Sequence, residues 1–170
     1  MHNKYTPIAD HDYQIIEAYI DKPEVTQWYV NAFNKFNING IDVMRWHWSW
    51  WAFFGSVFYL LYRKAYLAAG ILFLLIIVSG VIPFGSFILW ILCGGYAPYF
   101  VYKTYKEKRL EVESVIEDEG KRLETMRLVG GYNEWAIWLG VIIHIFIWGA
   151  IFSTLGLVLA LFGLVMGNAQ

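Results

Sequence analysis

The chain has 170 residues, of which 58% are hydrophobic, 19% aromatic and 16% charged, and its formal net charge is −1. A soluble domain is usually about 45–50% apolar and about 25% charged, so this composition is typical of an integral membrane protein. The near-neutral charge provides no basic surface for nucleic acid. The single cysteine, Cys93, excludes a disulfide framework within the chain and argues against a cysteine-based metal site.

Residues 1–45 lack the hydrophobic core of a cleavable signal peptide and are predicted to form short amphipathic helices. Asp10 or Asp12 would cap the first helix, and Pro23 suits the first turn of a second. A turn at Asn39–Gly40 ends the pattern. In the second helix, six apolar residues recur at intervals of three and four: Val25, Trp28, Tyr29, Ala32, Phe33 and Phe36. This stripe must pack on the aromatic segment that follows, on the membrane surface or on a later charged helix.

Residues 46–64 contain four tryptophans within six residues, then further aromatics, and end in a basic pair. As a helix, 48–62 would measure about 22 Å, which is short for a hydrocarbon core of about 30 Å. We therefore predict an aromatic helix in the cytoplasmic interface, or a segment that dips in and returns, because Trp and Tyr rings prefer that depth. The residues predicted to contact lipid headgroups are Arg45, Trp46, Trp48, Trp50, Trp51, Arg63 and Lys64. A pocket for a specific lipid, a quinone or another ligand is the alternative.

Residues 65–102 are predicted to form a transmembrane hairpin. Its first span, 65–82, has 18 residues without a charge, about 27 Å as a helix. The uncharged turn SGVIPFGS leads to a second span of 19 residues. Gly94, Gly95 and Pro98 would kink this second span or let another backbone approach it closely.

Residues 103–133 form the one strongly charged segment and are predicted to be a soluble helix that frays at Gly120. The sequence GGYN ends this helix, and Asn133 is placed to cap the next one. Opposite charges stand at helical spacing in the pairs Lys108–Glu111, Arg109–Glu113 and Lys121–Glu124. The acidic run 117–119 is interpreted as a solvated face rather than a site.

Residues 134–170 are predicted to form one long transmembrane helix. The apolar run from Trp135 to Met166 has 32 residues, about 48 Å as a helix, so part of it projects beyond the bilayer unless the helix breaks near Gly149. Small residues recur along one face at steps of four and three: Gly149, Ser153, Gly156, Ala160, Gly163 and Gly167. This stripe packs either on the hairpin or on another copy of the helix. We favour self-association, because the helix is too long for the hairpin to cover.

Basic residues are distributed asymmetrically along the chain. Arg45, Arg63 and Lys64 lie directly before the first span, seven basic residues lie between the second and the third, and none lies in the hairpin turn or the C-terminal tail. The positive-inside rule therefore predicts a bacterial inner-membrane protein with a cytoplasmic N-terminus and charged helix, and with the hairpin turn and C-terminus outside.

The polar residues do not form a pattern that indicates catalysis. His47 and His144 lie at different predicted depths, so a transmembrane haem or a metal site is not expected. His144 is the intramembrane polar residue, and two roles stay open for it: packing through a hydrogen bond, or a proton or ion relay. The chain has no H-E-x-x-H motif and no phosphate-binding glycine loop, and we expect neither enzyme activity nor a cofactor.

The aromatic block WSWWAFFGSVFYLLYRKAY resembles the signature of a family of small bacterial inner-membrane proteins classed as a domain of unknown function. The matching residues are Trp50, Ala52, Phe53, Phe54, Gly55, Tyr62, Arg63 and Lys64. The tyrosine-rich exit APYFVYKTYKEKR is similar to that of the family, although an asparagine expected near Ala97 is absent. The resemblance covers residues 33–109 and implies an integral inner-membrane protein without implying any chemistry.

The sequence therefore predicts an all-α membrane protein with three transmembrane helices and additional amphipathic helices at the cytoplasmic surface. The predicted function is that of a non-enzymatic scaffold, assembly or regulatory subunit. Its expected partners are membrane lipids, further copies of itself and a protein docked on the cytoplasmic helices. The alternative is an oligomeric channel or a lipid-handling protein walled by the last helix.

Overall fold

The structure is a computed structural model that describes residues 10–38 and 40–167. The fold class is all-α, as predicted, with one two-residue hairpin. The helices are α1 (Asp10–Ile20), α2 (Pro23–Phe36), α3 (Trp50–Gly55), α4 (Val57–Tyr62), α5 (Tyr66–Ser79), α6 (Gly85–Val115), α7 (Glu119–Val129) and α8 (Glu134–Gly167). The strands β1 (Asn37–Ile38) and β2 (Ile41–Asp42) pair antiparallel. Of the predicted turn between them, Asn39 lies outside the described residues.

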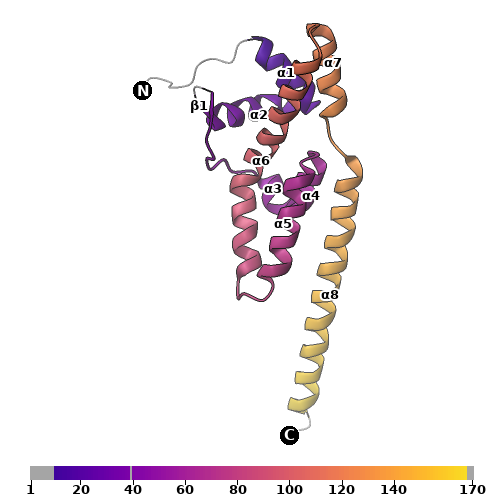
Figure 1. Cartoon of the computed structure of the whole chain (residues 1–170). Helices are drawn as coiled ribbons and strands as arrows, with labels where there is room; N and C mark the ends of the chain where they lie inside the picture. The colour runs from indigo at the N-terminus through magenta and orange to yellow at the C-terminus, as the bar shows by residue number, and fades with distance from the viewer. Residues whose placement is uncertain (1–9, 39, 168–170) are drawn as a thin grey trace.

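The elements gather into a head and an apolar stem (Figure 1). The head comprises α1, α2, α7 and the charged part of α6 (residues 103–115). The stem comprises α5, the remainder of α6 and α8, with α3 and α4 between α6 and α8. In Figure 1, α8 continues well past the turn that joins α5 to α6.

The amphipathic helix α2 supplies much of the core of the head. Its first turn contains Pro23, whose missing N–H costs nothing at that position. Phe33 stacks on Tyr105 of α6 with ring centroids 5.0 Å apart, and Phe36 lies 5.8 Å from Tyr102. Of the three partners considered for the apolar stripe of α2, the charged helix is therefore a principal one.

The second predicted span and the first part of the charged segment, 103–115, form one continuous helix, α6, of 31 residues, so the charged segment is two helices and not the one predicted. An ion pair between Arg109 and Glu113, with a distance of 2.6 Å, stabilises the part of α6 that extends beyond the stem. The helix ends at Val115, and Asp118 caps α7 by accepting a hydrogen bond from the Lys121 amide at 2.8 Å. The sequence predicted fraying at Gly120, but the helix is interrupted before that residue, at 116–118. The reason is that the Asp118 carboxylate caps the start of α7.

The first predicted span is shorter than the sequence indicates. Helix α5 has 14 residues, about 21 Å, and ends at Ser79 rather than Ile82. The turn after it is tight: the Gly85 amide donates to the Ile82 carbonyl, and a Cβ on Gly85 would lie 2.6 Å from the Ser79 carbonyl oxygen. Pro83 also disfavours helical backbone at the residue before it.

Two stretches are long and apolar enough to cross a membrane, and they contain α6 and α8. The structure does not confirm three spans, since α5 is too short to qualify by the same criterion. Helix α8 has 34 residues and continues through Gly149 without a break. The alternative of a broken last helix is therefore excluded.

The aromatic region 46–64 is not one helix. Its first residues are extended, and two helices of six residues each follow, α3 and α4. Ser56 separates them with φ +46° and ψ −121°, a backbone conformation that non-glycine residues rarely adopt. The uninterrupted aromatic pattern of the sequence gives no sign of this turn.

Candidate functional site

The aromatic segment, defined here as residues 43–64, begins against two adjacent glycines of α6. A Cβ on Gly95 would lie 2.4 Å from the Trp46 ring, and a Cβ on Gly94 would lie 2.8 Å from the Trp48 ring. The two indoles stack with centroids 5.9 Å apart. The glycines therefore provide a flat seat for two tryptophans, which matches the prediction that another backbone approaches α6 here.

Pro98 explains why this backbone approaches at Gly94. In an α-helix the Gly94 carbonyl would accept a hydrogen bond from the amide of residue 98, and proline has no N–H. The Ser49 amide donates to the Gly94 carbonyl at 2.8 Å, and the His47 amide donates to the Gly95 carbonyl at 2.9 Å. An unpaired carbonyl in an apolar environment costs several kcal/mol. The extended part of the aromatic segment thus satisfies the group that Pro98 leaves open.

Helix α3 is fixed at both of its ends. At the N-terminus, Ser49 Oγ accepts a hydrogen bond from the Ala52 amide at 3.2 Å. Near the C-terminus, Cys93 Sγ of α6 donates to the Ala52 carbonyl at 3.4 Å. Among the described residues, the buried hydroxyl of Ser56 has no hydrogen-bond partner. The chain thus reverses towards α4 at a strained residue with an unsatisfied polar group.

Helix α4 leads back to the head along α8. The Phe58 ring lies against Gly140, where a Cβ would be 3.0 Å from it. His144 lies one turn further, with its ring centroid 6.1 Å from that of Phe58 and its Nδ1 hydrogen-bonded to the Gly140 carbonyl at 2.7 Å. Gly140 is about 9 Å and His144 about 15 Å along α8 from Glu134. The aromatic segment therefore begins beside α6 and returns to the head beside α8.

Arg63 ties the returning end of the segment to the head. Its side chain is buried, with 5% exposure, and its Nη1 donates to the Ile20 carbonyl at 3.1 Å, at the C-terminus of α1. The guanidinium also lies 4.6 Å from the Tyr29 ring centroid and 4.9 Å from that of Tyr62. A cation at a helix C-terminus is favourable because it complements the helix dipole.

Lys64 and Asn133 complete this junction. The Lys64 Nζ donates to the Gly130 carbonyl, directly after α7. The Asn133 amide donates to the Tyr62 carbonyl at 2.9 Å, and its side-chain Nδ2 donates to the Leu61 carbonyl at 3.0 Å. The sequence placed Asn133 at the start of the last helix, but the structure shows that its side chain also joins α8 to the aromatic segment.

The residues predicted to contact lipid headgroups therefore divide into two groups. Arg63 lies inside the protein, which corrects the prediction that it faces lipid, whereas Lys64 is half-buried and donates to the Gly130 carbonyl after α7. Their burial depends on α1 and α7, which lie far from them in the sequence. The other predicted residues keep exposed or half-buried side chains, and lipid contact stays a prediction for them: Arg45, Trp46, Trp48, Trp50 and Trp51.

Asp42 forms a polar cluster where α6 enters the head. It accepts hydrogen bonds from Lys106 at 2.6 Å, from the Tyr102 hydroxyl at 2.7 Å and from Lys103 at 3.2 Å. Burial by itself would raise the pKa of Asp42, but these three hydrogen bonds outweigh it and lower the pKa to about 2. The sequence analysis missed this cluster, because its two halves are more than 60 residues apart.

His47 lies at the boundary between head and stem. Lys35 donates to His47 Nδ1 at 3.1 Å, and the Trp28 ring lies 4.7 Å from the imidazole. Burial and the nearby lysine lower the pKa of His47, so the neutral imidazole is favoured. Among the described residues, no group of three or more His, Cys, Asp or Glu side chains is placed to hold a metal ion.

These features define an all-α protein with two helices long enough to cross a membrane, in which an aromatic segment is wedged between them. The chain belongs to the family described as protein of unknown function (DUF2628), whose model matches residues 15–106. The predicted membership of a family classed as a domain of unknown function is thereby confirmed. The matched region includes the aromatic segment, its glycine seat and Asp42 with its two lysines, whereas α7 and α8 lie outside it. No curated protein and no solved structure matches the chain.

Proposed function

We propose that the chain is a non-enzymatic scaffold, assembly or regulatory subunit of a bacterial inner membrane that self-associates through the far half of α8, residues 149–167. The observation that supports this proposal is the contrast within α8. Ala136 is fully buried and Gly140 is covered by Phe58, whereas every side chain from 151 to 161 is exposed. Gly149 and Gly156 have no atom within 4 Å of a Cβ built on them. The hairpin therefore leaves the stripe uncovered in a single chain.

The length of α8 is the second argument for a partner. Its 34 residues measure about 51 Å, against a hydrocarbon core of about 30 Å. A tilt absorbs only part of this excess, and the far half carries no charge that would suit water. A second copy that packs on the small-residue stripe would bury this surface. Gly163 and Gly167 continue the stripe, but their surroundings lie outside the described part of the chain.

The proposed topology has three transmembrane helices, with the head in the cytoplasm and the C-terminus outside. It is supported by the distribution of basic residues, because none lies in the hairpin turn or in the last helix. In this topology α5, at about 21 Å, crosses only with local thinning of the bilayer or with help from the uncharged turn. A C-terminal reporter fusion that is active only outside the cytoplasm tests the orientation.

The head is the proposed docking surface for a protein partner. Several large apolar side chains on α6 and α7 are exposed there: Leu110, Val115 and Leu128. They stand among charged residues, which is the usual composition of a transient interface. A partner that co-purifies with the wild-type chain and is lost from a Leu110→Asp, Leu128→Asp variant would support this role. Recovery of that partner with the variant would contradict it.

The first experiment is native mass spectrometry of the purified chain in mild detergent. We expect a defined homo-oligomer for the wild type and loss of that oligomer in Gly156→Leu, because a larger side chain separates the backbones. Ala150→Leu is the matched control, since it adds the same side chain about 100° away from the stripe and should keep the oligomer. A wild-type monomer, or equal effects of the two substitutions, would exclude the stripe as the assembly surface.

An oligomeric channel or a lipid-handling protein is the second candidate function. A channel has less support, because Thr154 donates its hydroxyl to the Ala150 carbonyl and His144 bonds to Gly140, so both polar groups engage their own helix. Conductance in reconstituted bilayers that disappears in Gly156→Leu would favour the channel. A role with lipid is favoured by an apolar cavity between α5 and α6.

A further inference from the structure

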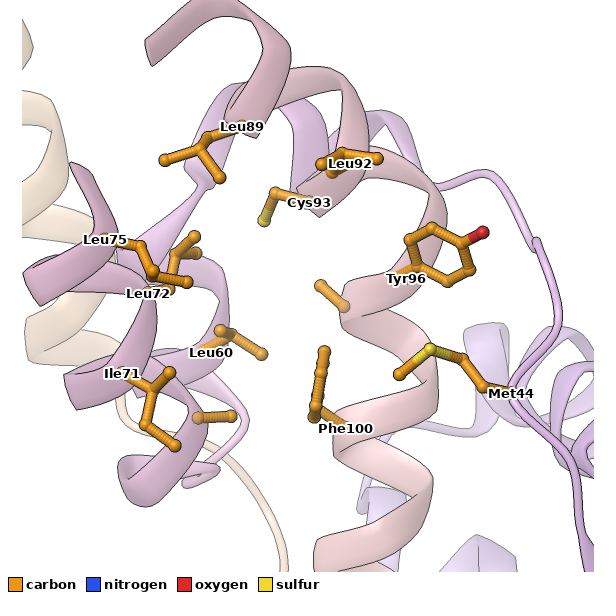
Figure 2. Close-up of a pocket in the computed structure, with 12 residues that line it drawn as sticks. Met44, Leu60, Ile71, Leu72, Leu75, Leu89, Leu92, Cys93, Tyr96 and Phe100 are labelled. Carbon is orange, nitrogen blue, oxygen red and sulfur yellow. The ribbon is translucent and has the colours of Figure 1, made fainter. Parts of the chain in front are cut away.

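A cavity of about 190 Å³ lies between α5 and α6 (Figure 2). Its wall is apolar: Ala68, Leu72 and Leu75 come from α5, and Leu89, Cys93 and Ala97 come from α6. Figure 2 shows the hydroxyl of Tyr96, which also lines the cavity, directed away from the enclosed space. Water needs two to four polar partners in a cavity, and this lining does not provide them. The lining therefore suits an apolar occupant better than water.

The cavity is a half-open groove in the stem, because Ile71, Leu75 and Leu92 of its lining are exposed. Leu60 of α4, at 2% exposure, forms part of its wall, so the aromatic segment helps to enclose it. Two small buried residues of α6, Cys93 and Ala97, create the space opposite the leucines of α5. Hydrocarbon that covers the exposed apolar side chains of this groove would add dispersion contacts that the chain alone does not make.

The dimensions of the cavity match one leaflet of a bilayer. Its lining on α6 extends from Leu89 to Phe100, eleven residues apart, which is about 16 Å along the helix. One leaflet contributes about 15 Å of hydrocarbon, half of the core thickness. Phe100 lies one turn before Lys103, at the boundary with the head. The cavity thus extends from the level of the head into the stem for the length of one leaflet.

The charges at the head end of the cavity are suited to a phosphate. Arg45 follows the lining residue Met44 and is exposed, and Lys103 lies one turn beyond Phe100. Lys103 and Lys106 both pair with the Asp42 carboxylate, and their two positive charges exceed its single negative charge, so a net positive charge remains at this end. Basic side chains at this level attract anionic lipid headgroups, while their stems lie along apolar surface.

We propose that this cavity holds one acyl chain of a bilayer phospholipid, whose phosphate lies at the head end near Arg45 and Lys103. The bound chain would act as a packing element between the short helix α5 and α6. This inference rests on the proposed membrane location but does not depend on self-association through α8.

The first test counts phospholipids retained per chain. Phosphatidylglycerol is titrated into the detergent-purified protein, and native mass spectra are recorded. Ala68→Phe places a ring in the cavity, whereas Leu67→Phe adds one to a neighbouring residue that is 79% exposed and does not line it. We expect the wild type and Leu67→Phe to retain one phospholipid per chain and Ala68→Phe to lose it. Equal retention by the two variants, or a bound mass that is not a phospholipid, would overturn the proposal.

The second test needs no substitution and therefore does not depend on the folding of a variant. Cys93 is the only cysteine of the chain, and it lines the cavity. A small, uncharged thiol reagent should modify it in detergent, and added phosphatidylglycerol should slow that reaction several-fold. An unchanged rate at saturating phospholipid would refute occupation of the cavity. If Gly156→Leu becomes a monomer but keeps its phospholipid, the lipid site and the assembly surface are shown to be independent.

Discussion

Helix α8 meets two different environments along one uniformly apolar sequence. From Glu134 to His144 it packs against α4, and Gly140 allows the Phe58 ring to approach its backbone. From Ile151 to Leu161 every side chain is exposed, and Gly156 has open space where a Cβ would be. Gly140 is thus covered by another side chain of the same chain, whereas Gly156 is not. A glycine in an apolar sequence therefore does not by itself indicate which surface of a helix is packed. Its neighbours in space show whether it lies in an internal contact or on a surface that a second copy can reach.

The largest expected difference comes from enlarging one glycine that is packed within the chain and one that is not. Gly95 of α6 represents the packed environment, and Gly156 of α8 represents the open one. Gly95→Val should destabilise the isolated chain by about 3 kcal/mol, because the Trp46 ring cannot move without losing its seat. Gly156→Val should leave the stability of the detergent-solubilised monomer unchanged within about 0.5 kcal/mol, since its surroundings are open. Thermal unfolding followed by tryptophan fluorescence measures both. Similar losses in the two variants would mean that the far half is packed within the chain.

Arg63 and Arg127 provide a second matched pair. Arg63→Met removes a buried cation that bonds to Ile20 and stacks on two tyrosines, and we expect a loss of about 2 kcal/mol. Arg127→Met removes an exposed cation whose ion pair with Asp21 has a distance of 3.9 Å, and we expect a loss of less than about 0.5 kcal/mol. Denaturant unfolding of the two variants gives the comparison. A small effect at Arg63 would show that the junction does not hold the head on the stem.

Ser56 offers a change in the opposite direction. Glycine tolerates φ +46° without strain, and Ser56→Gly also removes a buried hydroxyl that has no partner among the described residues. We expect an increase in stability of about 1 kcal/mol, smaller than the gross strain because glycine is more flexible when unfolded. Ser49→Ala is the contrasting variant, as it removes the cap of α3 and should cost about 1 kcal/mol. A destabilised Ser56→Gly would mean that the hydroxyl has a role in the aromatic segment.

The smallest expected effect is the pH dependence of Asp42. Its pKa in the folded chain is about 2, against an ordinary 3.8, so the folded state holds the ionised form more tightly than the unfolded state does. The stabilisation, about 1 kcal/mol after allowance for solvent screening, is complete above pH 4 and decreases as the pH falls towards 2. Melting temperatures of wild type and Asp42→Asn should therefore converge between pH 5 and pH 2. A constant difference across that range would show that the charge of Asp42 is not the source.

Much of the local structure was predictable from the sequence, because its causes are local. The periodic stripe of α2, the position of Pro23 and the pairing of Arg109 with Glu113 follow from spacing along the chain. Gly94, Gly95 and Pro98 likewise predicted either a kink in the second span or the close approach of another backbone, and the second of these is found. What they did not predict was which backbone, since the segment that supplies Ser49 and His47 lies about 45 residues earlier.

The sequence by itself therefore determined the all-α class, the two long apolar helices and the membership of the family, because composition and short-range patterns carry that information. The tertiary structure alone decided that the aromatic segment breaks at Ser56 and returns to the head, and that Arg63 is buried. The partners of the basic pair explain why: Arg63 bonds to a residue 43 positions away and Lys64 to one 66 positions away. A charge is placed by the groups that surround it in space, and only the packing of α1 and α7 against the stem brings those groups to Arg63 and Lys64.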